Sequence, residues 1–442
     1  MHRSIFPSLR RRLWKASLVA AAFSLLAVQV ALAASGGLDP TFSGDGRVAN
    51  SIITGQRSQA FDLVIQPNGA IIAAGESWAS KSNANIALAR YTTAGALDTS
   101  FNNTGRKVTD LGAIDYALGV DVDPTNGKVV VAGSKCRSAV GCNVAVVRYN
   151  SNGSLDTTFN GTGVRADDFG GGSNGGSPGV SIQSDGSILI AGYMFNPLTQ
   201  NYNFAVYRYT NAGQPDSAFS GDGRQQIDFG SGRHDFASSL VVQPDGRILV
   251  AGESCDLSGG KCNFALARLS ANGSLDTSFH SVGKLVTDFG GDDRAYGMAL
   301  QPDGRIVLVG VKYTVSTSYF ALARYTPGGL QDATFGVSGK KVIDFTGNAY
   351  PESARSVVIQ PDGKIVVCGT AGSATNSNFA LARFTSSGTL DLTFSGDGKV
   401  AVNLGYNEGC SALSLQSDGK YVLAGYTDNG SIRKFALARV LP

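Results

Sequence analysis

Histidine is scarce in this chain: only His2, His234 and His280 occur among its 442 residues. No Gly-x-Ser-x-Gly turn and no set of Ser, His and Asp can be recognised, so nothing points to a serine hydrolase. A lone histidine in a loop, such as His234 or His280, is expected to be a solvated side chain and not a catalytic base. Charged residues are few, at 16%, whereas glycine is abundant, at 57 residues. A disordered chain would carry more charge, so this composition predicts many short strands joined by tight turns.

The first 33 residues differ in character from the rest. They contain five basic residues, Arg3, Arg10, Arg11, Arg12 and Lys15. An apolar run over residues 18–30 follows, and the small-residue pattern Ala-Leu-Ala ends at Ala33. This is typical of a secretory signal peptide; a retained membrane anchor is the alternative, but Ser24 and Gln29 interrupt the apolar run. We therefore expect residues 1–33 to be cleaved and the protein to be periplasmic, cell-surface or extracellular, with no membrane contact.

Removal of this leader changes the charge balance. Without its five basic residues, 32 Lys and Arg remain against 34 Asp and Glu, so the formal charge of +3 becomes about −2. A nucleic acid partner then has no electrostatic basis. We expect a monomer that binds no nucleic acid.

Three short motifs recur seven times along the chain. The turn Gln-Pro-Asp-Gly, or a variant of it, begins at Gln66, Asp123, Gln183, Gln243, Gln301, Gln360 and Gln416. A segment related to Phe-Ala-Leu-Ala-Arg ends at Arg90, Arg148, Arg208, Arg268, Arg324, Arg383 and Arg439. The pattern Asp-x-x-Phe begins at Asp39, Asp98, Asp156, Asp216, Asp276, Asp332 and Asp391, with spacings of 56–60 residues. A fixed period of this size identifies a repeat protein, and we expect one domain over residues 36–442.

Each repeat contains four strand-like runs, which in the fourth copy span residues 237–243, 248–251, 264–269 and 285–289. Pro-Asp-Gly between the first two is turn chemistry, because Pro presets φ and Gly accepts a positive φ. Four antiparallel strands repeated radially form a blade of a β-propeller. The alternatives are a β-solenoid and an open sandwich array. A solenoid repeat is shorter and would not need two tight hairpins, and the chain termini favour a closed ring. The predicted fold is an all-β, seven-bladed propeller of four-stranded antiparallel blades.

The ends of the chain predict how the ring closes. The first strand after the leader, residues 47–53, can join the final strand, residues 435–440, as the outer strand of the last blade, which leaves no free edge. Small residues six positions before each Gln-Pro-Asp-Gly turn suggest crowding at the axis and place that strand innermost. The arginine of Phe-Ala-Leu-Ala-Arg precedes the Asp of Asp-x-x-Phe by eight residues in six copies. This regularity favours a structural ion pair over a ring of ligand-binding arginines, and closure predicts a seventh pair between Arg439 and Asp39.

The run QPDGRILVAG followed by NFALARLSANGSLDTSF resembles the bacterial delta-60 repeat family. The resemblance extends over all seven copies. It implies a propeller found in exported proteins, without an assigned activity and without a catalytic residue to carry over.

Cysteine usage fits export. Two pairs lie in equivalent short loops, Cys136 with Cys142 and Cys255 with Cys262. In an oxidising compartment they predict two disulfides; a metal site is the alternative, but no histidine or second cysteine pair is near. Cys368 and Cys410 occupy positions that are mostly Ala in other copies, so they are either buried small residues or a further pair.

One face of the predicted propeller varies between copies. It carries the loops over residues 76–85, 134–143, 193–203, 253–263, 311–319 and 426–434, and we call it the variable face. The opposite face, with the Gln-Pro-Asp-Gly and Asp-x-x-Phe turns, is the turn face. Aromatic residues on rigidly supported loops are typical of binding sites. The candidates on the variable face are Trp78, Tyr193, Phe195, Tyr202, Tyr313, Tyr319 and Tyr426.

Five copies carry an acid two residues before the small position of the inner strand. These acids are Asp115, Asp235, Asp293, Glu352 and Glu408. They are predicted to line the mouth of the channel, where they could hold a divalent cation; alternatively, each caps the N–H groups of its own loop. Sequences of the type Ser-Gly-Asp-Gly lack the further oxygen ligands of a calcium loop and indicate tight turns.

These features favour a non-catalytic exported propeller that binds a protein or carbohydrate partner through its variable face, without a cofactor. The alternative is a propeller hydrolase or lyase that uses the acidic channel mouth, with a divalent cation. A third possibility is a purely architectural module.

Overall fold

A computed structural model describes residues 34–442 apart from 81, 113, 139–140, 168–174, 231, 348–349 and 374–375. The predicted signal peptide, residues 1–33, lies outside the described residues. Within the described part of the chain there are 28 β-strands and no helix. In particular, no helix there is long and apolar enough to cross a membrane. The predicted all-β class is therefore correct.

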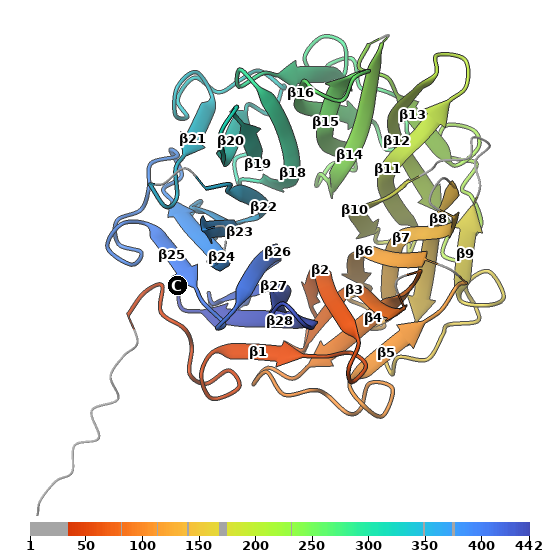
Figure 1. Ribbon diagram of the computed structural model, residues 1–442. Coiled ribbons are helices and arrows are strands. Elements are labelled where there is room, and N and C mark those ends of the chain that lie inside the picture. The colour runs from red at the N-terminus through yellow and green to blue at the C-terminus, as the bar shows by residue number, and fades with distance from the viewer. Residues whose placement is uncertain are drawn as a thin grey trace, which may run out of the picture. The chain divides into compact units, whose positions relative to one another are not determined.

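Seven four-stranded antiparallel blades surround a central axis (Figure 1). Blade 1 contains β2 (Arg57–Ile65), β3 (Ile71–Ser80), β4 (Asn83–Tyr91) and β5 (Arg106–Thr109). Blade 2 contains β6 (Ile114–Val122), β7 (Val129–Ser138), β8 (Gly141–Tyr149) and β9 (Val164–Asp167). Blade 3 contains β10 (Gly175–Ile182), β11 (Ile188–Asn196), β12 (Asn201–Tyr209) and β13 (Arg224–Ile227). Blade 4 contains β14 (Arg233–Val242), β15 (Ile248–Asp256), β16 (Cys262–Leu269) and β17 (Lys284–Thr287).

The remaining blades follow the same order. Blade 5 contains β18 (Asp292–Leu300), β19 (Ile306–Tyr313), β20 (Ser318–Tyr325) and β21 (Lys340–Ile343). Blade 6 contains β22 (Ser353–Ile359), β23 (Ile365–Ser373), β24 (Asn376–Phe384) and β25 (Lys399–Val402). Blade 7 contains β26 (Asn407–Leu415), β27 (Tyr421–Asp428), β28 (Arg433–Val440) and, as its outer strand, β1 (Arg47–Asn50) from the other end of the chain. One parallel bridge, between Ala84 and Ile114, links blades 1 and 2.

The first strand of each blade lies closest to the axis (Figure 1). These inner strands are β2, β6, β10, β14, β18, β22 and β26, and each contacts the inner strands of both neighbouring blades. The strand before Gln-Pro-Asp-Gly is therefore innermost, as the sequence predicts.

A β-bulge in the inner strands explains their small residues. In β2, Ala60 pairs with Gly75, and the ladder shifts register directly afterwards. Ala60 is buried between blades, and a Cβ on Gly75 would lie 1.9 Å from the carbonyl oxygen of Gln59. Close packing of the first two strands of each blade, and not crowding at the axis, therefore requires small residues here. The bulged residue that follows, Phe61, lines the central channel instead.

The outermost strand of every blade has only four residues. A short outer strand offers few unpaired N–H and C=O groups to another chain. The propeller thus protects its edges by keeping them short.

The hydrophobic core of the described residues consists of seven clusters, each between two neighbouring blades. Between blades 3 and 4, Phe204 and Val206 of β12 pack with Ala265 and Ala267 of β16. Large side chains of one blade thus fill the small face of the next, which follows from the alternation in Phe-Ala-Leu-Ala-Arg.

The arginine of this motif ties each blade to the next. In blade 4, Arg268 Nε donates to Asp276 Oδ2 at 2.8 Å, and the guanidinium lies 4.6 Å from the ring centroid of Phe279. Arg268 Nη1 also donates to the carbonyl oxygen of Pro327 in blade 5, at 2.7 Å. The ion pair and the ring contact recur at Arg90, Arg148, Arg208, Arg324, Arg383 and Arg439. The seven arginines are therefore structural and do not form a ligand-binding ring.

The N-terminal segment closes the ring, with β1 paired to β28 (Figure 1). Arg439 Nε donates to Asp39 Oδ2 at 2.8 Å, and Arg439 Nη1 donates to the carbonyl oxygen of Thr93 in blade 1. The side chains of Arg439 and Asp39 are 6% and 3% exposed. Burial alone would raise the pKa of Asp39, but hydrogen bonds from Thr41 and the charge of Arg439 lower it to about 2. The two residues that lack a partner within their own copy thus meet in a buried pair.

Three disulfides are present. Cys136–Cys142 joins β7 to β8, and Cys255–Cys262 joins β15 to β16. Both pairs are those predicted from the sequence. The third, Cys368–Cys410, joins β23 to β26 and so links blades 6 and 7. Of the two possibilities left by the sequence, a further pair or two buried small residues, the structure shows the pair.

Candidate functional site

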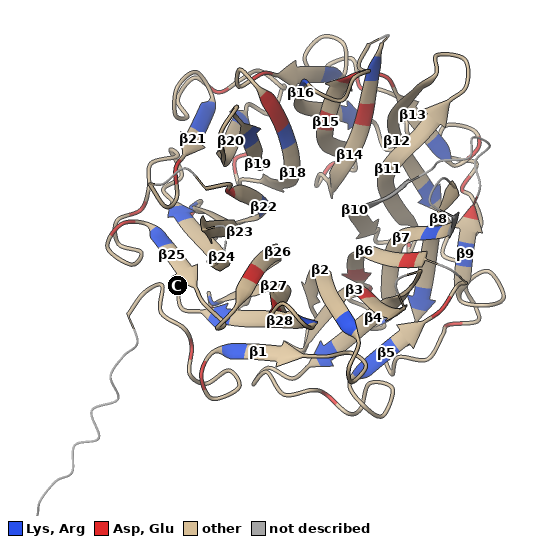
Figure 2. Cartoon of the chain, viewed as in Figure 1, with Lys and Arg blue, Asp and Glu red and all other residues tan. Residues whose placement is uncertain are grey.

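The five predicted channel-mouth acids are buried beneath loops of the variable face. Figure 2 shows acidic positions on the inner strands β14, β18 and β26. Asp115, Asp235, Asp293, Glu352 and Glu408 are at most 1% exposed. Each accepts a backbone N–H from the loop before its strand, at 2.6–2.9 Å. The donors are Leu111, Phe229, Phe289, Phe345 and Tyr406.

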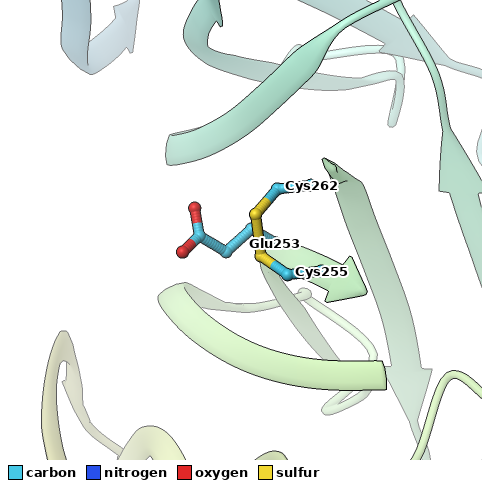
Figure 3. Close-up of side chains that lie close together, drawn as sticks. All are labelled: Glu253, Cys255 and Cys262. Carbon is cyan, nitrogen blue, oxygen red and sulfur yellow. A yellow bond between two sulfur atoms is a disulfide. The ribbon is translucent and has the colours of Figure 1, made fainter. Parts of the chain in front are cut away.

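The expectation that these acids line the channel mouth is therefore wrong, and the alternative role as loop caps describes them. They also do not gather at one point. Among the described residues, the only group of three or more His, Cys, Asp or Glu side chains within 4.8 Å of one another is Glu253, Cys255 and Cys262. In Figure 3 the two sulfur atoms of that group are joined in a disulfide, so neither is a thiolate that could bind a metal ion.

The buried caps predict how stability depends on pH. Burial raises the pKa values of Asp235 and Asp293 to about 6, although the hydrogen bonds from the N–H groups of Phe229 and Phe289 lower them. A raised carboxyl pKa stabilises the fold below the unfolded value near 4, and this contribution is lost as pH rises through about 6. In an Asp235→Asn, Asp293→Asn variant, the free energy of unfolding relative to the wild type should therefore increase by up to roughly 4–5 kcal/mol from pH 4 to pH 7, about half of it from each group.

Urea unfolding at the two pH values measures this difference. Thermal melts with and without Ca²⁺ provide the second readout. A Ca²⁺-dependent rise in Tm that occurs in the wild type and is abolished in the variant would contradict the capping role, because it would make these acids cation ligands.

The candidate aromatic residues are half-buried and lie at three blade junctions instead of forming one patch. Tyr193 and Tyr202 lie between blades 3 and 4, Tyr313 between blades 4 and 5, and Tyr426 between blades 7 and 1. Trp78 pairs with Arg57 in the ladder between β2 and β3 of blade 1. Tyr319 pairs with Lys312 in the ladder between β19 and β20.

The junction of blades 3 and 4 holds the densest group, which we call the aromatic patch: Tyr193, Phe195, Tyr202, His234 and Phe236. Ring centroids are 5.0 Å apart for Tyr193 and Phe236, 5.3 Å for Phe195 and Tyr202, and 5.4 Å for Tyr202 and His234. The Tyr202 N–H donates to His234 Nδ1 at 3.1 Å. His234 is therefore a packed ring and not the solvated loop residue expected from the sequence. Phe236 was not predicted as a site residue, because it lies in the inner strand β14 and not in a loop of the variable face.

The junction of blades 4 and 5 combines charge with aromatic rings. Arg294 lies 3.3 Å from Glu253 Oε1 and 3.1 Å from Asp292, and its guanidinium lies 6.0 Å from the centroid of Tyr313. Burial raises the pKa of Glu253 to about 7, although the charge of Arg294 opposes this rise. A pocket of about 770 Å³ opens beside Tyr313.

At the junction of blades 7 and 1, the Arg433 guanidinium lies 4.0 Å from the ring centroid of Tyr426. Arg433 Nη1 donates to Gln59 Oε1 at 2.6 Å, and Gln59 Nε2 donates to Glu76 Oε1 at 2.8 Å. Burial raises the pKa of Glu76, and hydrogen bonds with Trp78 and Gln59 and the charge of Arg433 only partly offset this rise. Tyr426 is thus held in a fixed orientation at the channel entrance.

The central channel contains a cavity of about 450 Å³. Bulged residues of the inner strands line it: Phe61, Leu118, Ser238, Tyr296, Arg355 and Ser411. Asp62 also lines it; burial raises its pKa to about 7, although its carboxyl accepts N–H groups from Leu63 at 2.8 Å and Val120 at 2.9 Å. None of these residues was predicted, because the bulged position has no common residue type among the copies.

The fold and these motifs define a seven-bladed β-propeller repeat protein. The chain belongs to the family described as "Domain of unknown function (DUF5122) beta-propeller", whose model matches residues 66–101, 125–159, 183–219, 243–279, 301–335, 360–394 and 416–442. The narrower resemblance to the delta-60 repeat stays a prediction from the motifs. No curated protein matches the sequence.

Solved structures share the architecture at low sequence identity. Trypanosoma rangeli sialidase, solved with sialic acid, is 7% identical with a TM-score of 0.46, covering 92% of this chain and 60% of that one. Polysaccharide lyase Uly1 is 11% identical with a TM-score of 0.45, covering 89% and 91%. Sqt1 from Chaetomium thermophilum is 11% identical with a TM-score of 0.45, covering 89% and 98%. Likenesses of this degree carry no argument about function.

Proposed function

We propose that this chain is an exported, non-catalytic propeller of the delta-60 type that binds a protein or glycan partner through its variable face. The observation that carries the proposal is the aromatic patch. Its rings are half-buried, so each is fixed by its neighbours and still presents part of its surface to solvent. Rigid aromatic side chains provide contact area at low entropic cost, which is typical of binding surfaces.

The turn face supports this choice by contrast. Its recurrent side chains form the ties between blades, as Arg268, Asp276 and Phe279 do, so they are already engaged. The variable face instead combines the aromatic patch with an apolar loop tip, Leu198, which is 93% exposed. A face that differs between copies suits recognition, because it is free of the packing that the repeat imposes.

Export and the absence of catalysis are supported separately. Three disulfides are consistent with an oxidising compartment. The enzyme alternative depended on an acidic channel mouth, and the five acids that it required accept loop N–H groups instead. We therefore assign no catalytic residue.

The test is binding of the purified, labelled protein to a glycan array and to envelope proteins of the producing cell. A Phe195→Ser, Leu198→Ser variant should bind at least about tenfold more weakly, because it removes apolar contact area from the patch and its rim. The matched control is Leu330→Ser, Leu392→Ser, which removes exposed apolar side chains from the turn face. The class of partner is identified by the glycan spots, or the one protein band, that bind the wild type and the control but bind the Phe195→Ser, Leu198→Ser variant more weakly. Equal binding by both variants, or release of a cleaved product from a bound glycan, would overturn the proposal.

A further inference from the structure

The channel cavity contains a positively charged group that the fold does not use. Among the described residues, no carboxylate lies within ion-pair distance of Arg355 and no hydrogen bond from its guanidinium is formed. Its guanidinium carbon lies 4.0 Å from the ring centroid of Tyr296 in the neighbouring inner strand. A planar guanidinium stacked in this way keeps its N–H donors free at the edge.

The repeat itself shows that a charge is not needed at this position. The equivalent bulged residues in other blades are Phe61, Leu118, Ser238, Tyr296 and Ser411. All of them build the same inner strand without a guanidinium. Cation–π stacking on Tyr296 contributes about 0.5–1 kcal/mol where solvent is present, which does not by itself account for an arginine in a channel.

Hydroxyl groups line the same cavity as Arg355. Ser239, Ser411 and Thr370 line it, are partly exposed, and form no side-chain hydrogen bond to a described residue. A ligand with several hydroxyl groups would satisfy them, because a serine or threonine hydroxyl both donates and accepts. Phe61 and Leu118 add apolar wall opposite this polar side.

The cavity has a suitable size and is connected to the variable face. Small-molecule sites typically measure roughly 300–1,000 Å³, and this cavity measures about 450 Å³. Tyr426 lines both the cavity and a pocket of about 270 Å³ on the variable face, beside Arg57 and Asp428. A ligand entering from that face would reach the inner strands past Tyr426.

We propose that the channel cavity binds a sugar acid, with the Arg355 guanidinium holding the carboxylate and the serine and threonine hydroxyls meeting the sugar hydroxyls. Guanidinium and carboxylate match in bidentate geometry, and such charge-assisted pairs are the strong ones. The charge of Arg355 also acts on Glu253, but Glu253 is paired with Arg294 at 3.3 Å. Asp62, which also lines the cavity, accepts the N–H groups of Leu63 and Val120. Neither carboxyl group forms an ion pair with Arg355. This site is distinct from the aromatic patch and does not depend on the proposed function of the variable face.

Isothermal titration of the full secreted chain with sodium D-glucuronate tests the proposal, with D-glucose as the uncharged match. Binding of glucuronate but not glucose is expected, and Arg355→Met should weaken it at least tenfold while thermal melting confirms that the variant is folded. The matched control is Arg247→Met, which removes an arginine paired with Asp245 on the turn face and should leave binding unchanged. A tri-glucuronate binding more tightly than the monomer would assign the site to the end of an acidic polysaccharide, and equal binding would assign it to a free sugar acid.

Three results would overturn the inference. The first is that neither D-glucuronate nor D-galacturonate gives a heat of binding. The second is that glucose and glucuronate bind equally well. The third is that Arg355→Met binds glucuronate as tightly as the wild type. Loss of glucuronate binding in the Phe195→Ser, Leu198→Ser variant would place the ligand on the aromatic patch and would also overturn it.

Discussion

An Arg439→Ala variant should lose about 3 kcal/mol of its free energy of unfolding, at the lower end of the roughly 3–5 kcal/mol for breaking a buried ion pair. The change leaves the buried carboxylate of Asp39 without its arginine. The loss falls at the lower end because Lys420 Nζ, 3.3 Å from the same carboxylate, still compensates part of the charge. The substitution of Arg439 also removes the donor to the carbonyl oxygen of Thr93 and the contact with the Phe42 ring. The last blade, the first blade and the closing segment therefore all lose contacts.

The pH dependence identifies the cause. Asp39 has a lowered pKa of about 2, so its contribution is present above the unfolded value near 4 and is lost as pH falls through about 2. The difference in free energy of unfolding between the wild type and Arg439→Ala should therefore shrink below pH 4. Urea titrations at pH 7 and pH 3 measure it.

Two matched variants separate closure from other effects. Arg224→Ala breaks an exposed pair, with Asp222, and should cost below about 1 kcal/mol. Arg268→Ala breaks the same tie away from the closure and should cost a similar amount to Arg439→Ala. Only Arg439→Ala should accelerate hydrogen exchange in β1, because only this arginine holds the closing segment. An Arg439→Ala variant no weaker than Arg224→Ala would refute the closure role.

The fold could be predicted from the sequence because the same information is present seven times. One copy with a Pro-Asp-Gly turn and alternating apolar residues would fit several β architectures. Seven copies at a constant period, with Asp39 and Arg439 left without partners at opposite ends, leave few alternatives to a closed ring. The innermost strand and two of the disulfides could be predicted for the same reason, because the residues that indicate them occupy equivalent positions in different copies.

The candidate site could be predicted only in part, because side-chain direction within a blade depends on the β-bulge. The position of Asp235 in the repeat predicts that its side chain lies at the mouth of the channel. In the structure, the pairing of β14 with β15 places this side chain beneath the loop that contains Phe229, where it is buried. The bulge then turns Ser238 and its equivalents toward the channel. A comparison between copies looks for what recurs, so it passes over Arg355 and Tyr296, which occur once each. The aromatic residues were found by type, but the expectation that they lie in loops was wrong, because all seven lie within strands near the variable face.

Deleting the closing segment should have a larger effect than any single substitution. A chain that begins at Thr54 lacks Phe42, Val48 and Ile52, which are buried in the cluster between blades 7 and 1. At about 1.5–3 kcal/mol for each buried side chain, the deletion removes roughly 5–9 kcal/mol before any loss of hydrogen bonds. Native domains are stable by only about 5–15 kcal/mol, so most or all of the stability is lost.

The deletion also exposes β28 as the edge of its sheet. Residues Phe435–Ala438 lose their pairing with β1, and this apolar strand then presents free N–H and C=O groups that invite pairing with another chain. Size-exclusion chromatography with light scattering should therefore show oligomers or aggregates, whereas a chain that begins at Ala34 should elute as a monomer.

A synthetic peptide of residues 34–53 provides the decisive control, because it can replace the missing strand without a covalent link. Added to the chain that begins at Thr54, it should restore monomeric elution and raise Tm in a concentration-dependent manner, as expected when a ligand binds only the folded state. The same peptide with Asp39→Asn and Phe42→Ser should rescue far less, because it lacks both the carboxylate for Arg439 and the ring beneath its guanidinium. If the shortened chain is monomeric by itself and melts close to the chain that begins at Ala34, the N-terminal strand covers an edge without closing the ring.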